Sequence, residues 1–220
     1  MERSRPHPLV AAAREAGVRD VRVLEAVAAV PRAAYVPGSW AGDADLDRPI
    51  PIGGRQVTTQ PSLVAAMVEA LALRGDERVL EIGAGLGYQA AILARLAREV
   101  WSLERRGELA EAARANLAAE CVDNAHVVMG DGSGGLPGHA PYQAIVVAAA
   151  HPRVPPPLAG QLSRGGRLVQ PMGPSGAEDV TLFRRAADGR LVRERSIVRA
   201  YFVPLYGRHG FSEEEDARRR

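Results

Sequence analysis

The stretch RVLEIGAGLGYQAAI contains three glycines at alternate positions. One acidic residue precedes them within this stretch, and another follows beyond its end. Gly83, Gly85 and Gly87 allow the backbone to bend and to approach a ligand closely. Glu81 lies two residues before the first glycine, and Glu104 ends the next apolar segment. A glycine-rich bend between a strand and a helix is a common nucleotide-binding element, but it does not by itself identify the nucleotide.

The charge beside the bend separates two kinds of cofactor. Dinucleotide sites space their glycines G-x-G-x-x-G and hold an anionic pyrophosphate at a helix N-terminus. Here the pattern is G-x-G-x-G, and the carboxylate of Glu81 would repel a phosphate. S-adenosylmethionine has no phosphate and carries an ammonium and a sulfonium group, which a carboxylate attracts. The sequence therefore favours S-adenosylmethionine over a nicotinamide dinucleotide.

Two further acids lie where a nucleoside would need them. Glu104 is placed to accept hydrogen bonds from both ribose hydroxyls, a role common to both cofactor types. Asp131, in MGDGSGG, could face the adenine amino group, although its spacing fits an Asp-Gly turn equally well. The expected cofactor-binding residues are Glu81, Gly83, Ala84, Gly85, Gly87, Glu104, Arg105, Asp131 and Gly132.

The elements around these residues alternate between strand and helix patterns. Continuous apolar strands separated by helices predict a parallel sheet covered on both faces. A hairpin pattern, VTLFRRA and LVRERSIV around the turn ADGR, then adds antiparallel strands, and AYFVPL predicts one more short strand. The expected fold is α/β, a doubly wound Rossmann-like sheet of seven mostly parallel strands. The parallel strands are predicted at RVLEI, EVWSLE, HVVMGD, YQAIVVAA and GRLVQPMG, and the helices at 88–97, 106–119 and PLAGQLS.

Three segments are expected along the chain. Residues 1–75 form a helical cap and a substrate loop, in which 9–30 is helical and a helix begins at Pro61. Residues 76–206 form the cofactor-binding core. Residues 207–220, which end in the charged and apolar-poor segment SEEEDARRR, are expected to form a flexible tail.

The composition limits the possible partners. Twenty-eight basic residues balance 26 acidic ones among 220, so the charge does not indicate nucleic-acid binding. The single Cys121 excludes an internal disulfide framework and is expected to be a small buried residue, and no spacing of ligands indicates a metal site. No signal peptide or membrane-spanning stretch is recognisable. We expect a cytoplasmic protein, without membrane partners, that works as a monomer.

Several segments between about residue 20 and residue 206 resemble the protein-L-isoaspartate O-methyltransferases. The most particular of these are DRPIPIGGRQVTTQP, GDGSGGLPGHAPYQAIVVAAA and QLSRGGRLV, whereas VLEIGAGLGYQAAILA is shared by many methyltransferases. The resemblance implies that S-adenosylmethionine is used to methylate the misplaced carboxylate of isoaspartyl residues in damaged proteins. The neighbouring amide would then attack the ester, so that methanol leaves and a succinimide forms. Hydrolysis of the succinimide regenerates some normal aspartate.

The chain departs from the family pattern near the expected substrate loop. The family motif T-I-S-x-P, whose serine is assigned to the active site, reads VTTQP here, so Thr59 takes the serine position and Val57 replaces the threonine. The family pattern G-Y-G-Q reads GGRQ, which places Arg55 in this loop. Tyr206 follows V-P-L, where many members have threonine. The resemblance implies Thr59 as the catalytic residue and residues 56–59, namely Gln56, Val57, Thr58 and Thr59, as substrate-binding.

Methyl transfer to a carboxylate needs no general base, because a group of pKa about 4 is already ionised at neutral pH. The protein must instead align the reactants and exclude water. We expect the Thr58 and Thr59 loop and the N-terminus of the helix at Pro61 to bind the substrate carboxylate. The alternative is that both threonines cap the helix. His151 is expected to be a surface loop residue.

Other functions fit parts of the sequence. A peptide-tailoring methyltransferase of the same family would methylate an ordinary aspartate of a modified precursor peptide, and the altered GGRQVTT loop keeps this alternative open. A cofactor-binding adaptor without catalysis is a second alternative. A nucleic-acid methyltransferase is disfavoured because VVAAAHP contains no D/N-P-P-Y-type motif. The same segment lacks the carboxylates that a metal-dependent methyltransferase would need.

Overall fold

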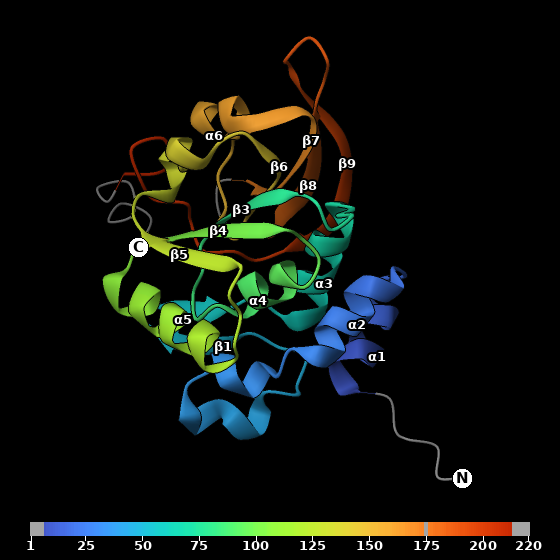
Figure 1. The fold of residues 1–220 in the computed structure, drawn as a ribbon, viewed down its shortest axis with the longest axis vertical. Helices are drawn as coiled ribbons and strands as arrows, with labels where there is room; N and C mark the ends of the chain where they lie inside the picture. The colour runs from blue at the N-terminus through green and yellow to red at the C-terminus, as the bar shows by residue number, and fades with distance from the viewer. Residues whose placement is uncertain (1–6, 174–175, 213–220) are drawn as a thin grey trace.

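The fold is a central sheet between two layers of helices and turns, and the computed structural model describes residues 7–173 and 176–212 (Figure 1). The strands are β1 Ile50–Gly53, β2 Gln56–Thr58, β3 Arg78–Ile82, β4 Glu99–Glu104, β5 Ala125–Met129, β6 Tyr142–Val147, β7 Leu162–Met172, β8 Glu178–Arg185 and β9 Leu191–Ala200. The helices are α1 Pro8–Glu15, α2 Val21–Ala29, α3 Pro61–Ala70, α4 Tyr88–Ala94, α5 Gly107–Ala119 and α6 Pro156–Gln161. Short 3-10 helices are η1 Arg32–Tyr35, η2 Gly38–Asp43, η3 Gly132–Gly134 and η4 Pro137–His139.

The seven-stranded sheet has the order β5-β4-β3-β6-β7-β8-β9. Strands β3 to β7 pair in parallel, and β8 and β9 complete the sheet with antiparallel pairs. The chain first extends the sheet from β3 in one direction and then returns to the other side of β3 with β6. A crevice forms at the carboxyl ends of strands on either side of such a reversal. The predicted doubly wound sheet with its terminal hairpin is confirmed.

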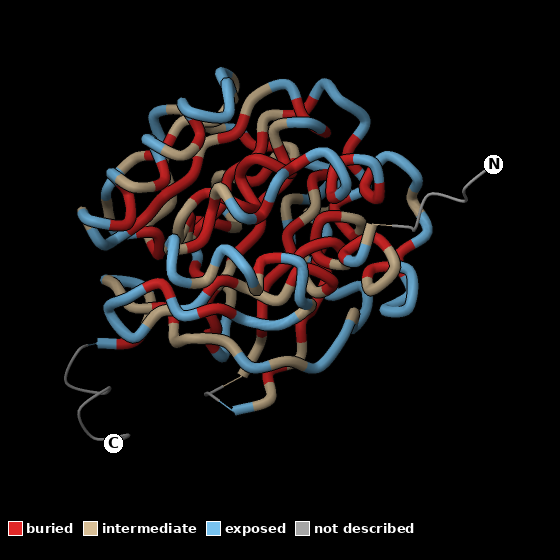
Figure 2. Tube along the Cα trace, turned by 90° about the horizontal axis from the view of Figure 1, so that it is seen from below, coloured by how far each residue is buried: buried red, intermediate tan, exposed pale blue. Residues whose placement is uncertain are grey.

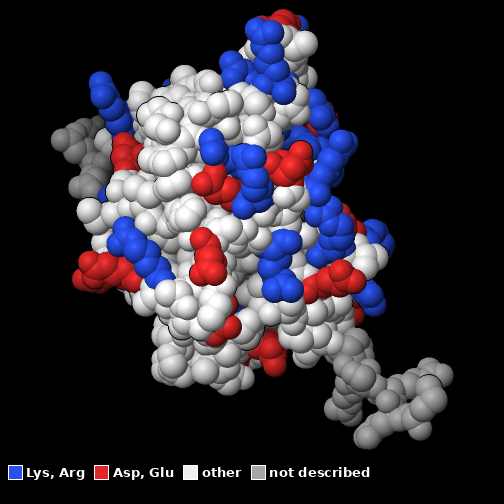
Figure 3. All heavy atoms as spheres, viewed as in Figure 1, with Lys and Arg blue, Asp and Glu red and all other residues white. Residues whose placement is uncertain are grey.

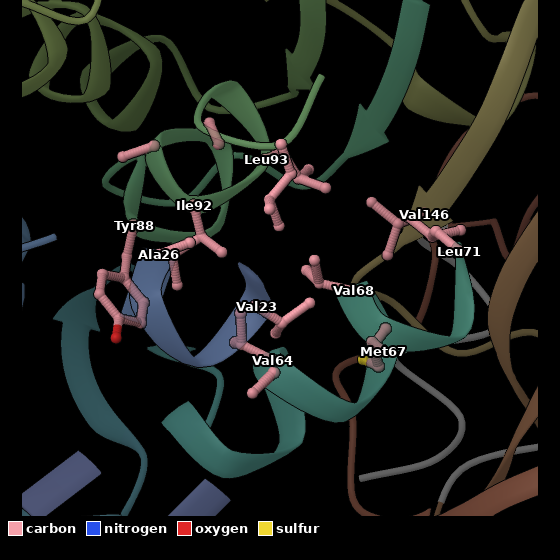
Figure 4. Close-up of a cluster of buried hydrophobic side chains, with 14 of the residues drawn as sticks. Val23, Ala26, Val64, Met67, Val68, Leu71, Tyr88, Ile92, Leu93 and Val146 are labelled. Carbon is pink, nitrogen blue, oxygen red and sulfur yellow. The ribbon is translucent and has the colours of Figure 1, made fainter. Parts of the chain in front are cut away.

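Alternating side chains of the strands pack on opposite faces of the sheet. Val146 of β6 belongs to the hydrophobic cluster with α1 to α5, whereas its neighbours Ile145 and Val147 pack with Leu158 of α6. Figure 4 shows how α2, α3 and α4 meet beneath the sheet, with Val68, Leu71 and other apolar side chains directed toward one another. The burial of these side chains positions the cap against the sheet because apolar area is removed from water along the whole contact.

The substrate loop expected between residues 41 and 60 contains a β-hairpin. Strands β1 and β2 pair in antiparallel fashion around Gly54 and Arg55, whose φ angles are +55° and +59°. Two consecutive residues with positive φ are characteristic of a tight hairpin turn. Ile50 and Ile52 of β1 are buried while Pro51 between them is exposed, so the alternation of a half-buried strand was present in PIPIGG.

The end of the chain differs from its prediction. AYFVPL forms no separate ladder strand: β9 continues to Ala200, and an isolated bridge then joins Pro204 to Ala150. Residues 207–212 do not fray as a tail, because Arg208 N donates to the Asp131 carboxylate and Gly207 N to the carbonyl of Phe211. We call residues 203–211 the C-terminal strap. The remaining part of the predicted tail, 213–220, lies outside the described residues.

Burial and charge follow the layered fold. In Figure 2, buried segments occupy the middle of the molecule, and exposed segments lie mostly at its periphery. Basic and acidic side chains are interspersed on the face in Figure 3, as the near balance of charge suggests. Among the described residues, no helix has the length and apolar character needed to cross a bilayer. Cys121 is exposed rather than buried, because it follows the end of α5 in a turn where its φ is +54°.

Candidate functional site

The glycine-rich bend joins β3 to α4 at the carboxyl edge of the sheet. Gly83 and Gly85 have φ angles of +96° and +55°, which a residue with a side chain rarely adopts. Gly83 N donates to the carbonyl of Leu103 at 2.8 Å and so ties the bend to the end of β4. Gly87 is the N-cap residue of α4 with φ +98°, and an added Cβ would lie 3.3 Å from Leu117 Cγ. Gly87 therefore serves the packing of helices.

Glu81 lies beneath the bend and is fully buried. Its carboxylate accepts a hydrogen bond from Gln89 Nε2 at 3.0 Å and another from the Ser102 hydroxyl. Burial raises the pKa of Glu81 to about 7, against the opposing effect of these two hydrogen bonds. Glu81 supports the bend from below and does not line the cleft above it. The direct contact with a ligand that we expected of this residue is replaced by contacts to its two polar neighbours.

Glu104 lies at the end of β4, as expected, and only 6% of its surface is exposed. One carboxylate oxygen accepts from Gly85 N at 3.0 Å, and the other accepts from Arg106 N at 3.0 Å. These bonds fix the carboxylate against the bend while each oxygen keeps further acceptor capacity. Glu104 also lines the cleft, where a sugar hydroxyl could donate to it.

A cleft of about 950 Å³, part of it open to solvent, lies above the bend. Its walls come from the bend, from the β1–β2 hairpin with the following loop, and from the C-terminal strap. Of the residues proposed from the sequence, it brings together Gln56, Val57, Thr58, Thr59, Gly83, Ala84, Gly85, Glu104, Arg105 and Gly132.

Asp131 lies outside this lining and holds backbone instead. Its carboxylate accepts from Ser133 N at 2.9 Å, at the start of η3, and from Arg208 N at 2.7 Å in the C-terminal strap. Burial raises the pKa of Asp131, but the hydrogen bonds from Arg208 and Ser133 outweigh it and lower the net pKa. The Asp-Gly turn is thus the arrangement found, and the Asp131 carboxylate is bonded to the backbone of the strap.

The two threonines differ in role. Thr58 is buried, and its hydroxyl accepts from Arg32 at 2.8 Å and from Ile50 N at 3.2 Å, which fixes the hairpin to η1. Thr59 is half-buried and lines both the main cleft and an adjoining groove formed with residues of the 199–203 segment. Its neighbour Val57 is 47% exposed and lies in both linings as well.

Neither threonine caps α3. Asp47 does so from the preceding loop, because its carboxylate accepts from Ser62 N at 2.8 Å and from Gln60 Nε2 at 2.7 Å. The positive end of this helix already has a carboxylate beside it. A substrate carboxylate at this helix terminus would lie near Asp47, so its binding there stays a prediction, and the alternative that the threonines cap the helix is not the arrangement found.

Some site residues were missed in the sequence. Tyr35, Tyr88 and Gln89 line the cleft, and Tyr35 Oη, Tyr88 Oη and Gln89 Oε1 are buried without a hydrogen-bond partner among the described residues. Buried polar atoms usually have partners, so these three are available to a polar ligand. Together with the Glu104 carboxylate they fit a nucleoside carrying an amino acid. The GYQ that directly follows the bend was the signal for two of them.

His151 is buried rather than on the surface. Its Nδ1 lies 2.7 Å from the carbonyl of Arg153, and its ring meets Phe211 edge-on with centroids 4.8 Å apart. The side chain packs against the C-terminal strap and does not line the cleft. No proton transfer in the cleft can be assigned to it from this position.

Known proteins share this architecture. A solved structure named protein-L-isoaspartate O-methyltransferase superposes with a TM-score of 0.81 at 28% identity, over 96% of this chain and 68% of the other. A Plasmodium falciparum structure, whose title gives a complex with S-adenosyl-L-homocysteine, has a TM-score of 0.76 at 19% identity, over 92% and 99% of the two chains. The latter supports the fold.

Sequence comparison gives the family. Proteins named protein-L-isoaspartate O-methyltransferase are 50% identical to this chain in Methanoregula boonei, over 89% of each chain, and in Anaeromyxobacter dehalogenans, over 86% of this chain and 91% of the other. Residues 4–210 match the family described as protein-L-isoaspartate(D-aspartate) O-methyltransferase. The cleft thus lies in a chain that matches this family over nearly its whole length, and the protein belongs to the protein-L-isoaspartate(D-aspartate) O-methyltransferase family.

Proposed function

We propose that this protein transfers a methyl group from S-adenosylmethionine to the free α-carboxylate of L-isoaspartyl residues in damaged proteins and so initiates their repair. Family membership supports this activity. The observation that carries it in the structure is that one cleft joins the glycine bend and Glu104 to the loop of Thr59. A cofactor site and an acceptor site must share a space of this kind for direct group transfer.

The cofactor half of the cleft is assigned to the bend and its neighbours. Glu104 accepts hydrogen bonds from the ribose, and Gly83 and Gly85 keep side chains away from the ligand. Gln89 Oε1, held through its Nε2 by Glu81, is placed to accept a hydrogen bond from the amino acid part. Bound S-adenosylmethionine supplies an electrophilic methyl group.

The acceptor half lies at Thr59. The Thr59 hydroxyl holds one oxygen of the substrate carboxylate, which leaves the other oxygen free to attack. A tighter grip on the attacking oxygen would lower its nucleophilicity. The adjoining groove, lined by Thr59, Val57 and Tyr201, gives the flanking peptide a path to the cleft.

No side chain has to remove a proton in this reaction. The acceptor carboxylate, of ordinary pKa about 4, is ionised at neutral pH. Alignment and exclusion of water are the contributions of the protein. The apolar side chains of Ile52, Val64 and Leu205 line the cleft and reduce the water around the reacting atoms. The ester leaves the site, and its closure to a succinimide needs no further group of the protein.

We also propose that the protein acts in the cytoplasm as a monomer, without nucleic acid or membrane. The near balance of charge supports this, and one chain supplies both halves of the cleft. Isoaspartyl-containing proteins are its substrates.

The experiment is a comparison of two peptides. The protein is incubated with methyl-labelled S-adenosylmethionine and either an isoaspartyl peptide or its aspartyl twin. Base is then added to hydrolyse any methyl ester, and the labelled methanol that is released is counted. We expect methanol from the isoaspartyl peptide alone. Methylation of the aspartyl twin would instead support the peptide-tailoring activity. Cofactor binding without any methyl ester on either peptide would support a non-catalytic adaptor and contradict the proposal.

A further inference from the structure

Arg105 and Tyr206 approach the cofactor cleft from two separate elements. Arg105 directly follows Glu104 at the end of β4, and Tyr206 belongs to the C-terminal strap. Both residues line the cleft. The Arg105 guanidinium carbon lies 5.0 Å from the centroid of the Tyr206 ring, within the range of a cation–π contact. This contact joins the segment that carries Glu104 to the strap across the cleft.

The strap holds Tyr206 in place from both sides. On the N-terminal side, Leu205 N donates to the carbonyl of Ala150 at 2.8 Å. On the C-terminal side, Arg208 N donates to the Asp131 carboxylate at 2.7 Å. Gly207 lies between, where an added Cβ would be 1.9 Å from Asp131 Oδ1, so the strap approaches Asp131 as closely as a glycine allows. Tyr206 therefore lies on a segment anchored before and after it, which limits the movement of its ring.

The charge of Arg105 also calls for an explanation. An exposed guanidinium beside a site for a cationic cofactor is unfavourable by Coulomb's law. The Tyr206 ring offsets part of this cost, because the face of an aromatic ring is electron-rich and attracts the Arg105 guanidinium. The ring, in turn, gains a partner that keeps it over the cleft. A small side chain at 206 could make no such contact.

We propose that Arg105 and Tyr206 form a clasp over the cofactor half of the cleft that slows the release of S-adenosylmethionine and S-adenosylhomocysteine. This inference rests on the proposed function, because it requires that the cleft hold this cofactor. The clasp is a contact between side chains, so it can open without unfolding the strap. Its role is retention of the cofactor, and it contributes no group to the methyl transfer.

The test measures S-adenosylhomocysteine binding without any peptide. Equilibrium affinity and dissociation rate are compared for the parent protein and for Tyr206→Thr, Tyr206→Phe and Arg105→Gln. We expect Tyr206→Thr and Arg105→Gln each to raise the dissociation rate by about 3- to 30-fold, the range of one cation–π contact. Tyr206→Phe keeps the ring face and should stay within about twofold of the parent. The double variant Tyr206→Thr with Arg105→Gln should lose little more than either single variant, because both remove the same contact.

Arg98→Gln is the matched control, since it removes one exposed arginine just before β4, at the opposite end of that strand. It should bind like the parent. Midpoints of thermal unfolding without ligand show whether the variants are folded. Unchanged dissociation in Tyr206→Thr and Arg105→Gln, or single effects that add fully in the double variant, would overturn the clasp. Failure of the parent to bind the ligand would overturn the proposed function as well, so the two failures are distinguishable.

Discussion

Two adjacent hydroxyl groups at positions 58 and 59 have different surroundings, and this difference favours Thr59 as the residue of the proposed acceptor site. The Thr58 hydroxyl is used by Arg32 and by the backbone of Ile50. The Thr59 side chain lies at the junction of the cleft and the adjoining groove. In the sequence the two residues could not be separated by chemistry, because the partner Arg32 lies 26 residues away. The resemblance to the family selected Thr59, and the structure leaves its side chain in the cleft.

The hydroxyl of Thr59 can be tested by substitution. Thr59→Val should lower kcat/KM for an isoaspartyl peptide by about 10- to 100-fold, because a hydrogen bond to a charged group is lost. Thr59→Ser keeps the hydroxyl and should stay within a few-fold of the parent. Methyl transfer is measured at equal folded fraction, checked by circular dichroism. Full activity of the valine variant would remove Thr59 from the acceptor site.

Glu81 should make the stability of the protein depend on pH. Burial raises its pKa from 4.5 to about 7, so between these values the folded protein binds more protons than the unfolded chain. The contribution of Glu81 to the free energy of unfolding therefore falls as pH rises through this interval, by at most about 3 kcal/mol.

Urea unfolding of the parent and of Glu81→Gln measures this effect. The variant lacks the titrating group, so its stability relative to the parent should increase from pH 5 to pH 8. A difference that is constant over this range, or that moves in the other direction, would show that Glu81 stays ionised throughout.

At the scale of elements, local patterns predicted most strands and helices, and long-range contacts determined the rest. Apolar runs such as RVLEI and YQAIVVAA were sufficient for β3 and β6. The C-terminal strap depends on Asp131, which lies 77 residues before its partner Arg208. No local periodicity carries such a contact, and a charged end with few apolar residues was consequently interpreted as a tail. The same limitation applied to Asp47 at the start of α3.

The strap can be tested at Gly207. Gly207→Ala would place a Cβ 1.9 Å from Asp131 Oδ1, in a backbone conformation of φ +144° that favours glycine. We expect a loss of about 1–3 kcal/mol in the free energy of unfolding from this overlap. Gly138→Ala is the control, because nothing lies within 4 Å of its added Cβ. Equal stability of the two variants in urea unfolding would contradict the anchoring of the strap.

At the scale of the whole molecule, the cleft exists because three distant parts of the chain meet above the sheet. The bend follows β3, where the strand order of the sheet reverses. The hairpin belongs to the N-terminal cap, and the strap belongs to the C-terminal part of the chain. The sequence predicted the first through its glycines and the second through the family motif, but it did not predict that the strap forms a wall. Cap helices and sheet strands share one hydrophobic cluster, which joins the proposed 1–75 and 76–206 segments.

This shared core predicts that cap and core unfold together. Calorimetry of the parent should show one cooperative transition, with the calorimetric enthalpy equal to the van't Hoff enthalpy. Two separated transitions would indicate that the cap is an independent unit and that the cluster of Figure 4 contributes little to stability.

Under the proposed function, the cleft with Glu104 in its lining is a nucleoside site for a cationic methyl donor without phosphate. Isothermal titration calorimetry of the protein with S-adenosylmethionine, and separately with NAD, tests it most directly. We predict saturable binding of one S-adenosylmethionine per chain and no measurable binding of NAD. Tight binding of NAD together with no heat from S-adenosylmethionine would contradict the account.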